Sequence, residues 1–175
     1  MSSIAPIPHN AYSAWLEVAQ SAEYELVIFS PFLDEMVLHL FEESSLSGSK
    51  LGLVTQMDWE DSSIQGIKKE IVIDKLIAMG VDVRFLGRLH AKAIIADWEI
   101  AVIGSQNFTY YSQDSFEISF KANRYEEEDN LFDLFSTLEE WWENAEEWYV
   151  SWVQNVARQF GPYLPWASIL ERSCP

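Results

Sequence analysis

Cysteine is nearly missing from this sequence of 175 residues, and the single one, Cys174, is the penultimate residue. One cysteine can form neither an internal disulfide nor a cysteine-based zinc site. Glycine and proline are also scarce, with seven and six residues, which excludes fibrous and low-complexity proteins. No apolar run approaches the roughly 20 residues of a membrane-spanning helix, and the first residues lack the basic and apolar regions of a secretory signal. We therefore expect a cytoplasmic protein without integral membrane association.

Basic residues are few as well: 11 Lys and Arg stand against 28 Asp and Glu, so the net charge is -17. General binders of nucleic acid or anionic membranes rely on an excess of basic residues, so the composition argues against them while leaving room for a local basic site. Hydrophobic residues make up 49% of the chain, which excludes a disordered acidic protein. The charge is -8 over residues 1–124 and -9 over residues 125–175. We therefore predict a compact domain over 1–124 and an acidic, Trp-rich helical extension over 125–175.

Apolar periodicity predicts an α/β fold in which a mixed β-sheet is flanked by helices. The expected helices cover residues 10–22, 33–46 and 67–79, and the expected strands cover 25–30, 51–56, 81–86, 89–96, 100–103 and 116–120. A long C-terminal helix is expected over about 130–160, with an apolar stripe from Leu134 to Val156. The stripe could pack on its own domain or bind a second copy or a partner protein over 134–160. A third possibility is that the glutamates around the stripe form an acidic surface that mimics nucleic acid or shields a site.

The segment 89–108 carries the residues best suited to chemistry. Side chains alternate between the two faces of a strand, so His90 and Lys92 should point to the same side. After a turn, the returning strand brings Gly104 close to the same region, followed by Ser105 and Asn107. An imidazole, an ammonium, a hydroxyl and an amide together suit a phosphate ester.

This segment resembles the phospholipase D superfamily, whose signature is HxK, four residues, Asp, six residues and GSxN. The six fixed positions are all matched, by His90, Lys92, Asp97, Gly104, Ser105 and Asn107. The resemblance implies that residues 1–124 form a phospholipase D-like catalytic domain. It also implies a structural role for Asp97, which agrees with its place in a turn, and it points to Glu117 as the acidic residue on the next strand.

The resemblance implies a metal-independent phosphodiesterase without a cofactor. His90 would attack phosphorus and form a phosphohistidine, while Lys92 and Asn107 would hold the non-bridging oxygens, with help from Ser105. Glu117 would orient an imidazole. A second histidine must protonate the leaving group, yet the chain has only His9 and His39 besides His90, and neither belongs to a second motif. One-motif members of the superfamily form homodimers, so we expect a homodimer with one composite active site.

Loops at the ends of strands supply the other predicted contacts with substrate. The candidates are Ser30, Phe32, Trp59 and Arg88. A nuclease is the favoured function, because short one-motif members of the superfamily are typically nucleases. The alternatives are a phospholipid or small phosphodiester hydrolase, which the acidic composition suits better, and a non-catalytic regulatory protein that binds a partner through its C-terminal helix.

Overall fold

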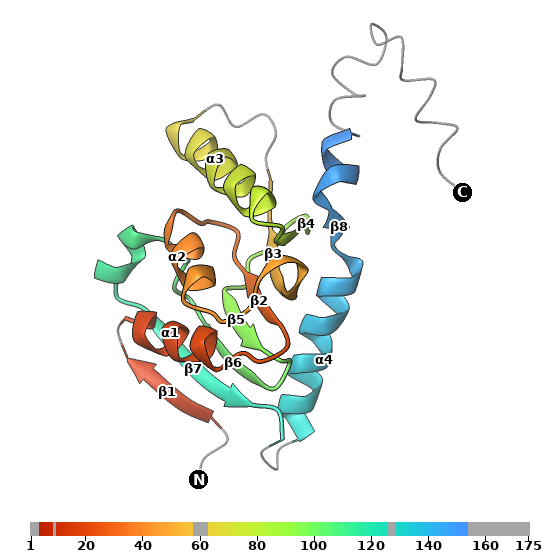
Figure 1. Ribbon diagram of the computed structural model, residues 1–175. Helices are drawn as coiled ribbons and strands as arrows, with labels where there is room; N and C mark the ends of the chain where they lie inside the picture. The colour runs from red at the N-terminus through yellow and green to blue at the C-terminus, as the bar shows by residue number, and fades with distance from the viewer. Residues whose placement is uncertain (1–3, 9, 58–62, 126–128, 154–175) are drawn as a thin grey trace, which may run out of the picture.

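A computed structural model describes residues 4–8, 10–57, 63–125 and 129–153. One mixed sheet runs through this part of the chain in the order β1-β7-β6-β5-β2-β3-β4-β8 (Figure 1). Its strands are β1 (Ile4–Pro8), β2 (Leu26–Phe29), β3 (Leu51–Thr55), β4 (Asp82–Phe85), β5 (Ala93–Ala96), β6 (Ile100–Gly104), β7 (Ile118–Asn123) and β8 (Glu146–Glu147). The predicted fold class, a mixed sheet flanked by helices, is confirmed.

The central strands are parallel and buried on both faces. β2 pairs with β3 and β3 with β4 in parallel register, and every residue of β2 and β3 is buried. The crossovers between them contain α2 (Met36–Glu42) and α3 (Ile64–Ala78). Continuous apolar runs are expected in strands covered on both sides, which is why these two strands were predictable from sequence.

Two hydrophobic cores lie on the two faces of the sheet. On one face, α1 (Tyr12–Ser21), α2 and α3 cover residues such as Leu26 and Ile28. On the other face, α4 (Asp129–Asn144) buries Leu131, Phe135 and Leu138 against Val27, Phe29 and their neighbours. In Figure 1 the blue-green α4 runs along the side of the sheet away from α1 and α2. The helix packs on its own domain, the first of the three possibilities that its apolar stripe left open.

The single helix predicted over 130–160 is wrong at its middle. α4 ends at Asn144, residues Glu146–Glu147 form β8 on the edge of β4, and helical turns resume over 148–153. Arg84 on β4 contacts the chain at this break: its Nη1 donates at 3.0 Å to the carbonyl of Trp142, which also accepts from the Ala145 N–H at 3.3 Å. Residues 154–160 lie outside the described residues.

Several other elements differ from the sequence prediction. β1 was not predicted, because two prolines argue against a central strand. They are tolerated because β1 lies at the edge of the sheet, where it pairs with β7. The helix expected over 33–46 is shorter, and 3-10 turns were missed at Gly48–Lys50 and Tyr110–Asp114. The strand expected over 89–96 begins only at Ala93, so the segment with His90 and Lys92 is irregular.

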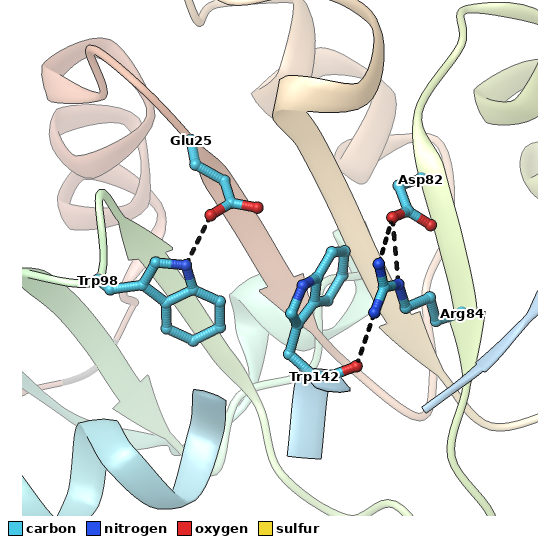
Figure 2. Close-up of polar contacts among 5 residues, drawn as sticks. All are labelled: Glu25, Asp82, Arg84, Trp98 and Trp142. Atoms are coloured by element: carbon cyan, nitrogen blue, oxygen red, sulfur yellow. Dashed lines mark hydrogen bonds and ion pairs between the residues drawn. The ribbon is translucent and has the colours of Figure 1, made fainter. Parts of the chain in front are cut away.

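The contact between α4 and the sheet depends on a glycine. Figure 2 shows the Arg84 guanidinium, held by Asp82, lying over the Trp142 ring, at 3.9 Å from its centroid. The edge of that ring, at Cη2 and Cζ3, meets Gly52 on β3, where an added Cβ would lie 2.5 Å from the indole. The sheet and α4 therefore come together at Trp142 only because position 52 has no side chain.

We expect Gly52→Ala to destabilise the fold by about 1–3 kcal/mol, because the methyl group must displace a ring that Arg84 holds in place. Urea unfolding of the two proteins measures the difference. Gly87→Ala is the matched control, since an added Cβ there meets nothing within 4 Å. Equal unfolding midpoints for Gly52→Ala and the parent protein would contradict the packing described above.

Candidate active site

The hairpin of β5 and β6 forms the frame of the candidate site. Its turn contains left-handed residues at Asp97 and Trp98, with φ of 56° and 55°. The Asp97 carboxylate accepts hydrogen bonds from the backbone N–H groups of Glu23, Tyr24 and Glu25, at 2.8–3.0 Å. Trp98 Nε1 adds a bond of 2.6 Å to the Glu25 carboxylate, which is drawn in Figure 2. Asp97 thus fixes the hairpin against the start of β2, at the opposite end of β5 from His90.

His90 and Lys92 lie side by side just before β5. Lys92 Nζ is 3.0 Å from His90 Nδ1 and donates to the His90 carbonyl at 2.8 Å. The imidazole is exposed, whereas Lys92 is 6% exposed. The backbone carbonyl of Lys92 accepts from the Gly104 N–H at 3.1 Å, which holds the irregular segment beside the end of β6. An accessible imidazole is therefore backed by a buried ammonium.

Burial lowers the pKa of Lys92, because an ammonium loses hydration inside the protein. The nearby Glu117 carboxylate acts in the opposite direction and raises the pKa of Lys92, but its effect is the smaller one. The Lys92 ammonium is thus kept in a poorly hydrated place where an anionic ligand would restore favourable interactions.

Gly104 and Ser105 bring β6 close to the start of β7. A Cβ on Gly104 would lie 2.5 Å from the Ile118 carbonyl oxygen and 2.7 Å from Ser119 Cα, so only glycine allows this approach. Ser105 Oγ donates a short hydrogen bond to Glu117 and accepts from the Ile118 N–H at 3.2 Å. Glu117 is the residue just before β7, and its described hydrogen bond is to Ser105, not to an imidazole.

His90, Lys92 and Ser105 line one cavity of about 620 Å³. Its other walls are mostly apolar and come from β6, β7 and the first turns of α4; they include Ile118, Phe120, Leu131 and Leu134. We call this space the histidine cavity. The structure therefore gathers three of the predicted catalytic side chains around a single hollow.

Asn107 is separated from these three. It lines a second cavity of about 600 Å³, together with Phe32, and its Oδ1 is buried without a hydrogen-bond partner among the described residues. Gln106 stands between the two cavities, buried, with its Oε1 accepting from the Ala11 N–H at 2.8 Å. We call the second space the amide cavity.

The predicted substrate contacts have different outcomes. Phe32 is 61% exposed at the amide cavity, and Arg88 is exposed in a left-handed turn two residues before His90. Ser30 is a correction: it is fully buried, and its hydroxyl donates to the Phe32 carbonyl at 2.6 Å, so it shapes the loop and does not reach a substrate. Trp59 lies outside the described residues.

Sequence reasoning missed the residues that complete the amide cavity, among them Gln56, Gln65, Lys68 and Tyr111. Gln56 directly follows β3, so the rule that sites form at strand ends could have found it. The others belong to α3 and to the turn after β6, whose approach depends on tertiary packing.

His39 stacks on Tyr12, with ring centroids 6.3 Å apart, and His9 lies outside the described residues. Within the described ranges, no group of three or more His, Cys, Asp and Glu side chains is placed to hold a metal ion. No helix in that part of the chain is long and apolar enough to cross a membrane.

The buried ammonium predicts a pH-dependent stability. The folded pKa of Lys92 is lowered, so between that pKa and the ordinary value of about 10.4 the unfolded chain binds more protons than the folded one. Stability must rise with pH across this window. As the pH rises toward about 10.4, we expect the free energy of unfolding of the parent protein to increase relative to that of Lys92→Met. Denaturant unfolding of both proteins at several pH values measures this, and a constant difference would contradict it.

Comparisons with known proteins agree with this architecture. The family model described as "Cardiolipin synthase, PLD-like domain" matches residues 16–137, well over half of the chain. Among curated proteins, none matches the sequence significantly.

Solved structures share the fold at low sequence identity. NucT from Helicobacter pylori has a TM-score of 0.64 at 13% identity, and Nuc from Salmonella typhimurium, a phospholipase D family member, has 0.61 at 14%. Each similarity covers 83% of this chain and 98% of the other. Phosphatidylserine synthase from Haemophilus influenzae has 0.55 at 10% identity, over 77% of this chain and 38% of its own. This chain, which carries the complete motif on its β5–β6 hairpin, therefore belongs to the phospholipase D-like family.

Proposed function

We propose that the protein is a cytoplasmic, metal-independent phosphodiesterase that works through a phosphohistidine at His90. The observation that carries the proposal is the pairing of an exposed imidazole with a buried ammonium at the histidine cavity. A neutral imidazole is a nucleophile toward phosphorus. The ammonium behind it can stabilise the charge that develops on the non-bridging oxygens.

The reaction takes two displacements. In the first, a ring nitrogen of His90 forms a bond to phosphorus, the bond from phosphorus to the leaving oxygen breaks, and an imidazolium gives that oxygen a proton. In the second displacement, the imidazole that acted as the acid is now neutral and takes a proton from water. The hydroxide oxygen forms a bond to phosphorus as the bond between His90 and phosphorus breaks. Asn107 and Ser105 would hold oxygens of the substrate; the hydrogen bond from Ser105 to Glu117 and the lining of the two cavities by these residues support this role.

We infer that the imidazole that serves as acid comes from another chain, because His39 on α2 stacks on Tyr12 and His9 belongs to no second motif. The surface beside the histidine cavity supports a homodimer. Phe116, Ile118 and Phe120 at the start of β7 are 99%, 56% and 41% exposed, and two of them line that cavity. A second copy that covers this surface would bring the partner's His90 toward the same hollow.

Nucleic acid is our first choice of substrate, and a phospholipid or small phosphodiester is the second. The apolar walls of the histidine cavity favour the second candidate, because they suit an acyl chain or a small organic ester. The amide cavity favours the first, as argued below. A non-catalytic protein that binds partners through residues 134–160 is the remaining alternative, and a trapped phosphohistidine would exclude it.

The test is hydrolysis in EDTA of three substrates: single-stranded DNA, a phospholipid and a chromogenic phosphodiester. We expect cleavage of the chromogenic ester and of DNA, with an acid-labile phosphoryl group trapped on the protein during turnover. Activity that EDTA abolishes, or turnover with no phosphoryl-protein at any time, would overturn the mechanism. Cleavage of phospholipid alone would replace the first substrate by the second.

A further inference from the structure

The amide cavity has a chemical character of its own. It lies where the loops after β2 and β3 meet the first turns of α3, and its rim carries Phe32 and Tyr111, which are 61% and 88% exposed. Three amide side chains line it, those of Gln56, Gln65 and Asn107. Flat apolar rings beside amide donors and acceptors are the groups with which proteins hold unpaired bases.

The amide side chains of Gln56, Gln65 and Asn107 make this cavity selective. Covering amide groups with an acyl chain, which cannot pair with them, would be unfavourable. A base can pair with an amide, because each base carries an N–H donor next to an acceptor on one edge. The amide cavity therefore suits a base better than a lipid tail.

The two cavities are lined by neighbouring residues of one segment. Ser105 lines the histidine cavity and Asn107 the amide cavity, and two residues of chain span at most about 7 Å. Gln106 lies between them in sequence and is buried, and its Oε1 accepts from the Ala11 N–H at 2.8 Å. On this spacing, a strand whose phosphodiester lies at His90 can extend toward the amide cavity.

Charge near the amide cavity is also compatible with a nucleic-acid strand. Lys68 lines it from α3 and is exposed, and Lys69 on the same turn donates from Nζ to the Pro31 carbonyl at 2.7 Å. Two lysines, Lys68 and Lys69, and one carboxylate, that of Asp34, line this cavity, whereas the chain as a whole has a net charge of -17. Lys68 can contact a backbone phosphate next to the bound base.

We propose that the amide cavity binds one base of a single-stranded nucleic acid, stacked on Tyr111 and Phe32 and hydrogen-bonded to Asn107, beside the phosphodiester at His90. The proposal deepens the proposed function and rests on it for the position of the scissile phosphate. Stacking on an aromatic ring contributes to the binding free energy of a base, so removing one such ring should weaken binding about 5- to 100-fold.

The experiment measures binding of a fluorescent single-stranded oligonucleotide to the full-length His90→Ala protein, which binds without cleaving. We expect a second substitution, Tyr111→Leu, to weaken binding about 5- to 100-fold, and Tyr111→Phe to preserve it, because the ring supplies the stacking face. Tyr24→Leu is the matched control, since Tyr24 is 72% exposed on a loop outside both cavities. Its affinity should equal that of the His90→Ala parent.

An abasic oligonucleotide separates stacking from phosphate contacts. It should bind the parent and the Tyr111→Leu protein equally weakly, because the base that the ring would hold is missing. Equal affinity of the parent and Tyr111→Leu for the normal oligonucleotide would overturn the proposal. The proposal would also be overturned if Tyr111→Leu weakened binding to phosphatidylglycerol vesicles but did not weaken binding to the oligonucleotide.

The chromogenic phosphodiester distinguishes failure of this inference from failure of the proposed function. If the wild-type protein hydrolyses that ester while Tyr111→Leu leaves oligonucleotide affinity unchanged, only the base site is wrong. If no ester is hydrolysed but oligonucleotide binding depends on Tyr111, the base site stands and the phosphodiesterase is wrong.

Discussion

His90→Ala is expected to lower the turnover of a phosphodiester at least about 1,000-fold, because it removes the nucleophile and, in a homodimer, the acid as well. Both losses come from a single change in the gene. The side chain is exposed, so its removal leaves the core intact, and the effect should appear in turnover with little change in the unfolding midpoint. Initial rates with the chromogenic ester, measured in EDTA, give the ratio.

His39→Ala is the matched control for this experiment. His39 on α2 stacks on Tyr12 of α1 and lines neither cavity, and its removal should leave turnover within about two-fold of the wild type. The phosphoryl group trapped on the wild-type protein should be missing from His90→Ala and present on His39→Ala. Turnover by His90→Ala within ten-fold of the wild type would show that another group attacks phosphorus.

The motif could be assigned from sequence because its geometry is local. His90 and Lys92 are two residues apart, and a two-stranded hairpin returns the chain to Gly104 whatever surrounds it. The turn at Asp97 was predictable for the same reason, although its three bonds to residues 23–25 were not. Spacing along one hairpin thus determines which groups meet.

Other parts of the site depend on contacts between distant segments, which a sequence pattern does not encode. The stripe on the C-terminal helix was visible, but the break at Ala145 coincides with pairing of the next residues on the edge of β4. Ser30 looked like a loop residue that could reach substrate, yet its backbone carbonyl accepts from Thr55 and its hydroxyl donates to the Phe32 carbonyl. Asn107 belonged to the motif, but its place at a second cavity depends on α3 and on the loops after β2 and β3, which form the rest of the lining.

Phe120→Asp is expected to produce a folded monomer that has lost at least about 100-fold in phosphodiesterase turnover. Phe120 is 41% exposed at the histidine cavity, so a carboxylate there meets water in the monomer, but in the dimer it would lie against the apolar surface of the second copy. The monomer keeps its own His90 and Lys92 and lacks the second imidazole. Sedimentation gives the oligomeric state, thermal unfolding verifies the fold, and hydrolysis of the chromogenic ester gives the turnover.

Tyr24→Asp controls for the added charge, since it places the same carboxylate on an exposed site away from both cavities, and it should remain an active dimer. Subunit mixing tests the composite site independently. If both imidazoles are needed, equal amounts of wild-type and His90→Ala subunits, allowed to exchange, should show about half the activity of the wild-type subunits alone, because random pairing makes half of the wild-type subunits inactive. Full activity in the mixture, or in monomeric Phe120→Asp, would mean that one chain supplies both nucleophile and acid. A loss of turnover in both the monomer and the mixed dimer would instead indicate that the partner's His90 is the acid. The apolar surface of β7 would then be part of the active site.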